Sequence, residues 1–143
     1  MTETVYVEGY ELILEILQDE ELNAFVLDKT GKKLAVIDSG PQVTTPAAGI
    51  FFQGLDVGQI ADRNTLYRVG YNVVFALPFW GTEGMRLCHE FLDKAIDAFL
   101  SHRRESSVPG RANFIESVQP LLVEDNAEKE WWTVAVRATV AIY

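Results

Sequence analysis

The chain has few thiol and imidazole groups, and this scarcity restricts the chemistry open to it. Its 143 residues contain one cysteine, Cys88, which excludes a disulfide within the chain and fits a reducing compartment. The two histidines, His89 and His102, fall on opposite sides of the apolar stripe of one expected helix, and no Cys/His pair has zinc-site spacing. Because Cys88 lies within that stripe, we expect a small core residue rather than a nucleophile.

Sequence motifs of cofactor and nucleophile sites are also missing. The chain contains no G-x-x-x-x-G-K-[ST], no G-x-G-x-x-G and no G-x-S-x-G motif, and its glycines Gly49, Gly54 and Gly58 are scattered. Carboxylates are so plentiful that a catalytic pair could be nominated from abundance alone, which carries little weight. We therefore expect no enzyme, no catalytic residue, no metal and no cofactor.

Positive charge is sparse and unevenly placed. The chain has 12 basic and 21 acidic residues, for a net charge of −9, and residues 1–28 hold eight of the acids and no Lys or Arg. The small basic groups are Lys29, Lys32 and Lys33, and further along Arg103, Arg104 and Arg111. Tight nucleic-acid binding requires a larger cluster, so we do not expect it. The acidic segment is either a solvated helix face or a functional patch.

Long hydrophobic runs are absent as well. No stretch approaches the roughly 18 apolar residues that span a bilayer, so we expect no membrane partner. The N-terminus carries acids where a signal peptide needs a basic start, and we expect no export signal. An apolar fraction of 48% is enough to fill one core, and the length predicts a single domain over residues 1–143.

Two long segments alternate between apolar and polar positions, the pattern of half-buried strands. They are residues 66–77 and 131–143. The expected inner faces carry Tyr67, Val69, Tyr71, Val73, Phe75 and Leu77, and Trp132, Val134, Val136, Ala138, Val140 and Ile142. The inner end of the first strand is apolar on both faces and is expected to be covered on both.

The clearest helix covers residues 83–102, where apolar residues recur at steps of three and four. Thr82 or a neighbour is expected to cap it. An amphipathic helix over residues 10–18 extends toward residue 28. Shorter strands are expected at 34–37, 47–55 and 114–123, with Pro120 at an edge or a bulge, and loops at 56–65, 103–113 and 124–130.

This order of elements favours hairpins over strand–helix–strand alternation. The predicted fold class is therefore α+β: a mostly antiparallel sheet of about five strands, with a long helix and an N-terminal helix packed on it.

Large aromatics at two places have two interpretations each. Phe79 and Trp80, in the strand-to-helix connection, are either core lids or anchors for a partner. Of Trp131 and Trp132, one is expected to be buried and the other to face a second helix or a neighbouring subunit. Apolar positions on the second strand faces add to the expectation of self-association.

The order of elements and several local phrases resemble the tail terminator, or tail completion, proteins of long-tailed bacteriophages, here from a prophage. The matching phrases are PAAGIFF at 46–52, VVFALP at 73–78, the helix from Glu83, and WTVAV at 132–136 leading to Tyr143. The likeness spans most of the chain, but it is one of pattern, and no residue in it carries chemistry.

The resemblance implies a structural virion protein that caps the tail tube as a ring, usually hexameric. Such a ring stops tube polymerisation and presents the surface for head joining. The implied partners are further copies of the chain, the tail tube protein and a head-completion or connector protein. The implied location is the host bacterial cytoplasm during assembly and then the virion tail.

For the contacts of such a ring we favour the loops at 56–65, 78–84 and 103–113. The candidate interface residues are Phe79, Trp80, Arg63, Arg103, Arg104 and Arg111. Solvated surface arginine is the competing interpretation of the four basic residues. Two other functions stay open: another tail or neck component of related fold, such as a tube protein or connector adaptor, and a small-ligand binding module.

Overall fold

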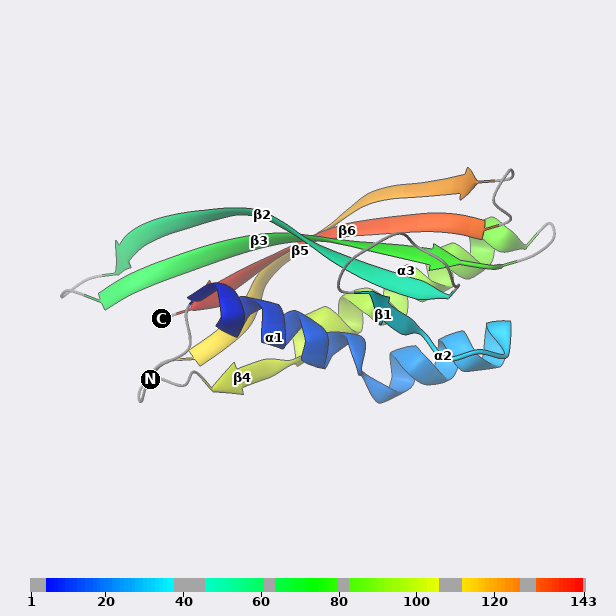
Figure 1. Ribbon diagram of the computed structural model, residues 1–143, viewed down its shortest axis with the longest axis horizontal. Coiled ribbons are helices and arrows are strands. Elements are labelled where there is room, and N and C mark those ends of the chain that lie inside the picture. The colour runs from blue at the N-terminus through cyan, green and yellow to red at the C-terminus, as the bar shows by residue number, and fades with distance from the viewer. Residues whose placement is uncertain are drawn as a thin grey trace.

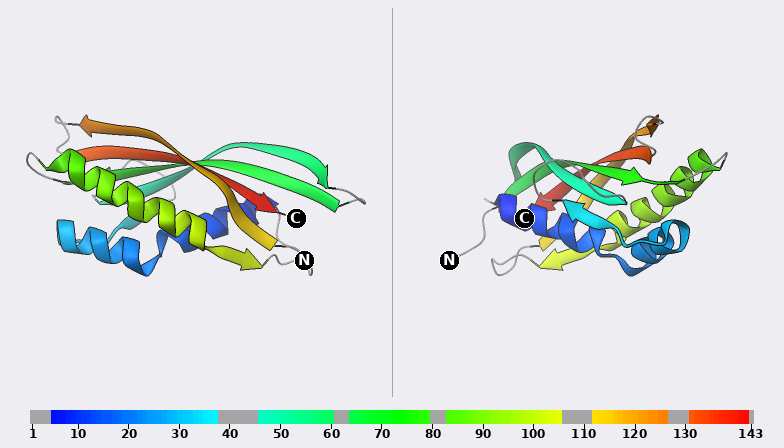
Figure 2. Two further views of the ribbon diagram at one scale, coloured as in Figure 1. Left: turned by 180° about the vertical axis from the view of Figure 1, so that it is seen from behind. Right: turned by 45° about the vertical axis from the view of Figure 1, so that its right-hand side comes forward.

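The computed structural model has two layers, one curved sheet and a layer of helices on one of its faces (Figures 1 and 2). It describes residues 5–37, 46–60, 64–79, 83–105, 112–126 and 131–142. The helices are α1 (Val5–Leu17), α2 (Glu20–Thr30) and α3 (Gly84–Ser101). The strands are β1 (Ala35–Ile37), β2 (Ala47–Ile60), β3 (Asn64–Leu77), β4 (Arg103–Glu105), β5 (Ala112–Asn126) and β6 (Trp131–Ile142).

The α+β class and the mostly antiparallel sheet are confirmed. The strand order is β1-β2-β3-β6-β5-β4, and β1 with β2 is the one parallel pair in the described part of the chain. The expected count of about five strands becomes six, because residues 103–105, predicted as loop, pair with β5 as the short strand β4.

The core lies between the sheet and the helices. Strands β3 and β6 are neighbours, and their inner residues oppose each other, as in Val73 with Val136 and Phe75 with Val134. All four of these side chains are fully buried. Phe75 also packs edge-on against Phe91 of α3, with ring centroids 4.8 Å apart. The predicted period-two faces of both strands are therefore confirmed, and their burial is the main source of stability.

Helix α3 matches the predicted helix to within one residue at each end and lies across the sheet (Figure 2). Its buried stripe includes Cys88, Phe91, Ala95 and Phe99, as expected, whereas Met85 in its first turn is 52% exposed. The N-cap position is Glu83, and its side chain makes no capping hydrogen bond. Thr82 lies outside the described residues.

The N-terminal helix is divided in two. Gln18 and Asp19 interrupt it, and the Asp19 carboxylate accepts a hydrogen bond from the Leu22 amide at 3.0 Å, which starts α2 anew. Gly31 ends α2 in the left-handed conformation, with φ of 75°, where glycine carries no side-chain penalty. The break lets α1 and α2 change direction: α1 packs on the sheet and on α3, and α2 packs on α3 (Figure 1).

The described residues of the three expected loops are strand. Residues 56–60 extend β2 and residues 64–65 begin β3, residues 112–113 begin β5, and residues 124–126 extend it. In each case polar residues had indicated a loop, but cross-strand pairing overrides that local preference. The prediction that Pro120 lies at a sheet edge or a bulge is confirmed. The pairing register shifts between Pro120 and Leu122, and β4 does not reach this part of β5.

No helix among the described residues lies on the outer face of the sheet (Figures 1 and 2). The expectation that the inner end of β3 is covered on both faces is only partly met on the outer face: Val74 and Ala76 are half-buried there, whereas their cross-strand partners Ala135 and Ala47 are buried. The tryptophan prediction is also only partly met. Neither Trp131 nor Trp132 is buried, and the half-buried Trp132 packs against the core beside Gly84.

Candidate interaction surfaces

Phe79 is a core residue in this structure. Its side chain is 3% exposed, and its ring stands edge-on to Phe25 of α2 with centroids 6.2 Å apart. Of the two interpretations of this residue, burial favours the core lid, since a partner cannot reach the ring without displacing α2. Trp80, the adjacent candidate, lies outside the described residues.

The candidate arginines are not brought together within the described ranges. Arg103 is exposed on β4, and its guanidinium lies 5.7 Å from the centroid of the Phe114 ring. The backbone of Arg104 pairs with Asn113 of β5, and its side chain is not described. Arg63 and Arg111 lie outside the described residues. The contact described for these arginines is therefore the cation–π pair of Arg103 with Phe114, between the neighbouring strands β4 and β5.

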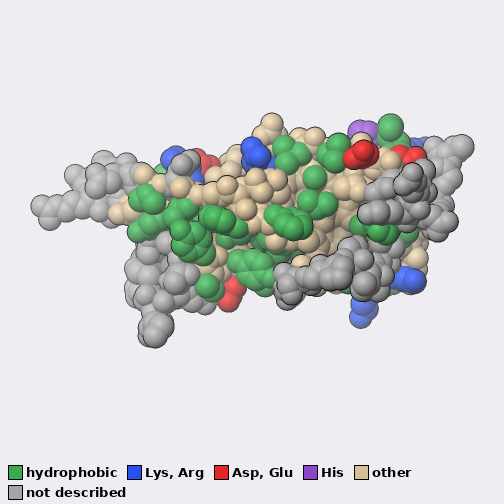
Figure 3. Space-filling model, turned by 45° about the horizontal axis from the view of Figure 1, so that its top comes forward, with side chains coloured by type: hydrophobic (Ala, Val, Ile, Leu, Met, Phe, Trp, Pro, Cys, Tyr) green, Lys and Arg blue, Asp and Glu red, His purple; other side chains and the backbone are tan. Residues whose placement is uncertain are grey.

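A shallow groove of about 660 Å³ crosses the outer face of the sheet. It lies where the sheet twists and where glycines leave the backbone uncovered. Its lining comes from four strands: Gln53, Gly54, Leu55, Arg68, Gly70, Glu116, Ser117, Arg137 and Thr139. Figure 3 views this side of the molecule obliquely and shows hydrophobic patches with isolated charged groups among them.

One wall of the groove is an ion pair between β3 and β5. The Arg68 Nε lies 2.8 Å from Oε2 and 3.1 Å from Oε1 of Glu116. The pairing register shifts between Ile115 and Ser117, and this irregularity leaves Glu116 without a directly opposed residue, so that it reaches across β6 to Arg68. Both side chains are partly exposed, which limits the pair to a small contribution to stability.

Arg137 occupies the middle of the groove. Its Nε donates to Oδ1 of Asn72 at 3.4 Å, and no carboxylate pairs with it in the part of the chain that the structure describes. Sequence periodicity placed Arg68 and Arg137 on polar strand faces. Periodicity could not predict that both arginines line one groove, because this depends on the register between β3 and β6, which are far apart in sequence.

A second surface lies along the outer edge of β2. Phe51 is 55%, Phe52 52% and Val57 61% exposed, and Tyr6 of α1 is 50% exposed. We call these four residues the β2 edge patch. The Tyr6 and Phe52 rings pack edge-on with centroids 5.4 Å apart, and the Tyr71 hydroxyl donates to the Tyr6 carbonyl oxygen at 3.0 Å. These contacts fix the start of α1 over β2 and β3.

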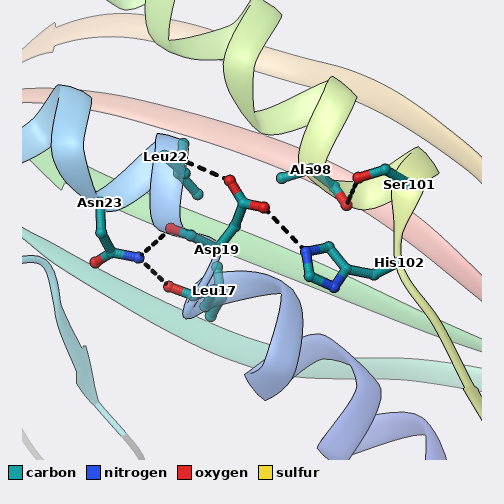
Figure 4. Close-up of polar contacts among 7 residues, drawn as sticks. All are labelled: Leu17, Asp19, Leu22, Asn23, Ala98, Ser101 and His102. Atoms are coloured by element: carbon teal, nitrogen blue, oxygen red, sulfur yellow. Dashed lines mark hydrogen bonds and ion pairs between the residues drawn. The ribbon is translucent and has the colours of Figure 1, made fainter.

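Two of the reactive side chains singled out in the sequence, Cys88 and His102, are held within the fold. Cys88 is fully buried, and burial together with the nearby Asp125 charge raises its thiol pKa to about 12, so it stays protonated. His102 Nε2 lies 3.0 Å from Oδ1 of Asp19 and joins the end of α3 to the α1–α2 break (Figure 4). The described residues hold no group of three or more His, Cys, Asp or Glu side chains placed to bind a metal.

Within the described ranges, no helix combines the length and hydropathy that a bilayer crossing requires. The chain matches no protein-family model, and a search of curated proteins gave no significant match.

Proposed function

We propose that this chain is a structural virion assembly protein of the tail terminator class. In this role a ring of copies caps the tail tube, stops its polymerisation and forms the surface for head joining. The observation that carries the proposal is the order of elements. The chain has an N-terminal helical segment, three strands, a long helix and two long closing strands, in that order. The strands form one mostly antiparallel sheet, the arrangement that the resemblance implies.

The surfaces of the chain are suited to contacts with other proteins. A closed ring needs two different patches on each subunit, so that one copy's first patch meets the next copy's second. The outer groove and the β2 edge patch are two such surfaces, and they differ in chemistry: one is lined by polar and charged groups, the other by aromatics. Because the described residues of two favoured loops, 56–65 and 103–113, are strand, we move the proposed contacts to these strand surfaces.

The acids of residues 1–28 that are described lie on the helical layer or at its break. Glu15 is exposed and Glu11 half-buried on α1, opposite the face that carries the groove. In the proposed ring this acidic layer lines or flanks the channel and keeps DNA from adhering. Reversing the charge of Glu11 and Glu15 should then leave assembly intact and slow DNA passage. Normal ejection by that variant would count against this placement.

Electron microscopy of particles from the source prophage tests the function. Deletion of the gene should leave overlong tails without heads, and purified protein added to growing tubes in vitro should arrest them. Absence of any tube after deletion would instead indicate a tube protein. Tails of normal length that fail to join heads would indicate a connector adaptor.

The groove favours one other candidate, a small-ligand binding module with an acidic ligand, because Arg137 has no carboxylate partner in the described residues. A thermal-shift screen against metabolites tests it. A stabilisation that disappears in Arg137→Gln would support this function, and the absence of any shift would argue against it.

A further inference from the structure

Two glycines face each other in the floor of the outer groove. Gly54 of β2 and Gly70 of β3 are cross-strand partners, and both line the groove. Glycine weakens a strand, because it loses more backbone freedom on folding and has no side chain to pack. A pair of glycines at one position of two neighbouring strands therefore lowers the stability of the sheet.

The fold itself does not require glycine at either position. Neither residue has a positive φ. A Cβ at Gly54 would meet nothing within 4 Å, and a Cβ at Gly70 would lie 3.7 Å from its nearest neighbour, Gln53 Cβ, which is an ordinary contact distance. The register shift in β2 beside Gly54 does not explain the pair, since β3 pairs with β6 without a shift. Strand glycines of this kind mark a place where a ligand or another backbone approaches closely.

A guanidinium stands at one end of this floor. Arg137 lies on β6, two positions before Thr139, which pairs with Gly70, and both β6 residues line the groove. The Arg137 Nε makes a long hydrogen bond of 3.4 Å to the neutral Asn72 side chain, and no carboxylate pairs with Arg137 within the described ranges. Its other N–H groups form a planar fork that matches a carboxylate.

The charge of the lining favours a ligand with one negative charge. The lining contains two arginines, Arg68 and Arg137, and one acid, Glu116, which leaves an excess of one positive charge. Glu116 lies 2.8 Å from Arg68 and matches its charge. A second negative charge on a ligand would therefore be repelled by Glu116. The floor between the charged groups is uncharged: it consists of Gly54, Gly70, Ser117 and Thr139.

We propose that the outer groove binds a small organic acid with a single carboxylate. The carboxylate pairs with the Arg137 guanidinium, and the uncharged remainder of the acid lies on Gly54 and Gly70. The groove volume of about 660 Å³ is within the range of small-molecule sites. This inference rests on the second function proposed above, the small-ligand binding module, and names its class of ligand and the residues that hold it.

Nuclear magnetic resonance titration of the full ¹⁵N-labelled chain tests the site, at constant neutral pH and ionic strength. The probes are n-butyrate and benzoate, with one negative charge, and succinate and sulfate, with two. Butyrate and benzoate should shift the backbone amide resonances of Gly54 and Gly70 in a saturable way. The dissociation constants of succinate and sulfate should be at least about threefold higher, because of the charge on Glu116.

Substitutions at the guanidinium test the carboxylate contact. Arg137→Gln should weaken butyrate binding at least about tenfold, and Arg137→Lys should weaken it less, because lysine keeps the charge but not the planar fork. The matched control is Arg86→Gln. Arg86 is an exposed arginine on α3 that does not line the groove, so this variant should bind butyrate like the wild type.

Substitutions of the glycines test the floor. Gly54→Ala, Gly70→Ala and the double variant should weaken butyrate binding progressively, because each added methyl group occupies the space of the ligand. Their free energy of unfolding should be equal to that of the wild type or higher, since both Cβ atoms have room and alanine orders less backbone. A loss of binding without a loss of stability separates a ligand site from a structural role.

Several results would overturn the proposal. These are the absence of saturable shifts with every probe, unchanged affinity in Arg137→Gln, and unchanged affinity in the double glycine variant. Groove shifts that grow with protein concentration without added acid, and vanish in Arg137→Gln, would assign the site to an acidic side chain of another copy instead.

Failure of this inference and failure of the binding module are distinguishable. An Arg137-dependent ligand from the thermal-shift screen that the glycine variants bind normally would retain the binding module and overturn the proposed floor. No ligand in either experiment would overturn both. The terminator assignment is judged separately, from tail length.

Discussion

Asp19 and His102 join the α1–α2 break to the end of α3, with 3.0 Å between Asp19 Oδ1 and His102 Nε2 (Figure 4). The other carboxylate oxygen of Asp19 accepts the Leu22 amide hydrogen bond that begins α2. Asn23 supports the same corner by donating from Nδ2 to the carbonyl oxygens of Leu17 and Asp19. A single carboxylate therefore caps one helix and holds the end of another, although 83 positions separate it from its imidazole partner.

Substitution of Asp19 and of His102 should separate the capping of α2 by Asp19 from the contact between Asp19 and His102. Asp19→Ala loses the cap and the pair and should lower the free energy of unfolding by about 1–3 kcal/mol. His102→Ala keeps the cap and should cost about 1 kcal/mol or less, since the pair is partly exposed to water. Urea unfolding followed by circular dichroism measures both. Equal losses in the two variants would show that the cap contributes nothing.

Acid should weaken this corner. Burial opposes ionisation of Asp19, but the hydrogen bonds from His102 and the Leu22 amide outweigh it and hold its pKa below the ordinary 3.8. A carboxyl with a depressed folded pKa contributes stability above its unfolded pKa, and that contribution is lost as pH falls through the folded value.

Asp19→Asn isolates this ionisation, because asparagine caps helices about as well as aspartate. The contribution of Asp19 ionisation to the stability difference between wild type and Asp19→Asn should begin to fall below about pH 5, one unit above the ordinary pKa of 3.8. It should shrink further as the pH falls below the 3.8 of an ordinary aspartate. Unfolding curves at a series of pH values measure it. A difference that grows on acidification would show that the sign is wrong.

Gly84 is required by its neighbour Trp132. A Cβ at Gly84 would collide with Nε1 and Cε2 of the indole, at the first residue of α3. Alanine normally favours a helix over glycine by about 1 kcal/mol, but here Gly84→Ala should destabilise by about 1–3 kcal/mol. The control is Gly54→Ala, where a Cβ meets nothing within 4 Å.

A smaller side chain at position 132 should relieve the collision. The double variant Gly84→Ala with Trp132→Phe should lose less stability than the sum of the two single changes. Thermal unfolding of the four proteins measures this coupling. Strict additivity would mean that the indole is not what excludes a side chain at Gly84.

Truncation of Phe79 should cost far more stability than truncation of Phe51. Phe79→Ala removes a ring that is 3% exposed and should cost about 3–5 kcal/mol. Phe51→Ala removes a ring that is 55% exposed and should cost about 1 kcal/mol or less. Denaturant titration compares them. A stable Phe79→Ala protein that fails to assemble would restore the interpretation of Phe79 as a partner anchor.

Local periodicity was sufficient for the class of fold. The alternation in β3 and β6 and the three-and-four spacing of α3 depend on neighbours along the chain, and each element forms where the pattern placed it. Boundaries were less accurate where polar residues belong to strands. Residues 56–60 and 124–126 look like loops in isolation and are strand because a partner strand pairs with them.

The candidate surfaces could not be predicted from the order of residues along the chain. The ion pair of Arg68 with Glu116, the hydrogen bond of Arg137 to Asn72, and the contact of Asp19 with His102 all join segments distant in sequence. Burial of alternating apolar residues follows from the hydrophobic effect and is encoded locally. The matching of one strand or helix to another is set by how whole elements pack, and this packing gives the chain its groove on the outer face of the sheet.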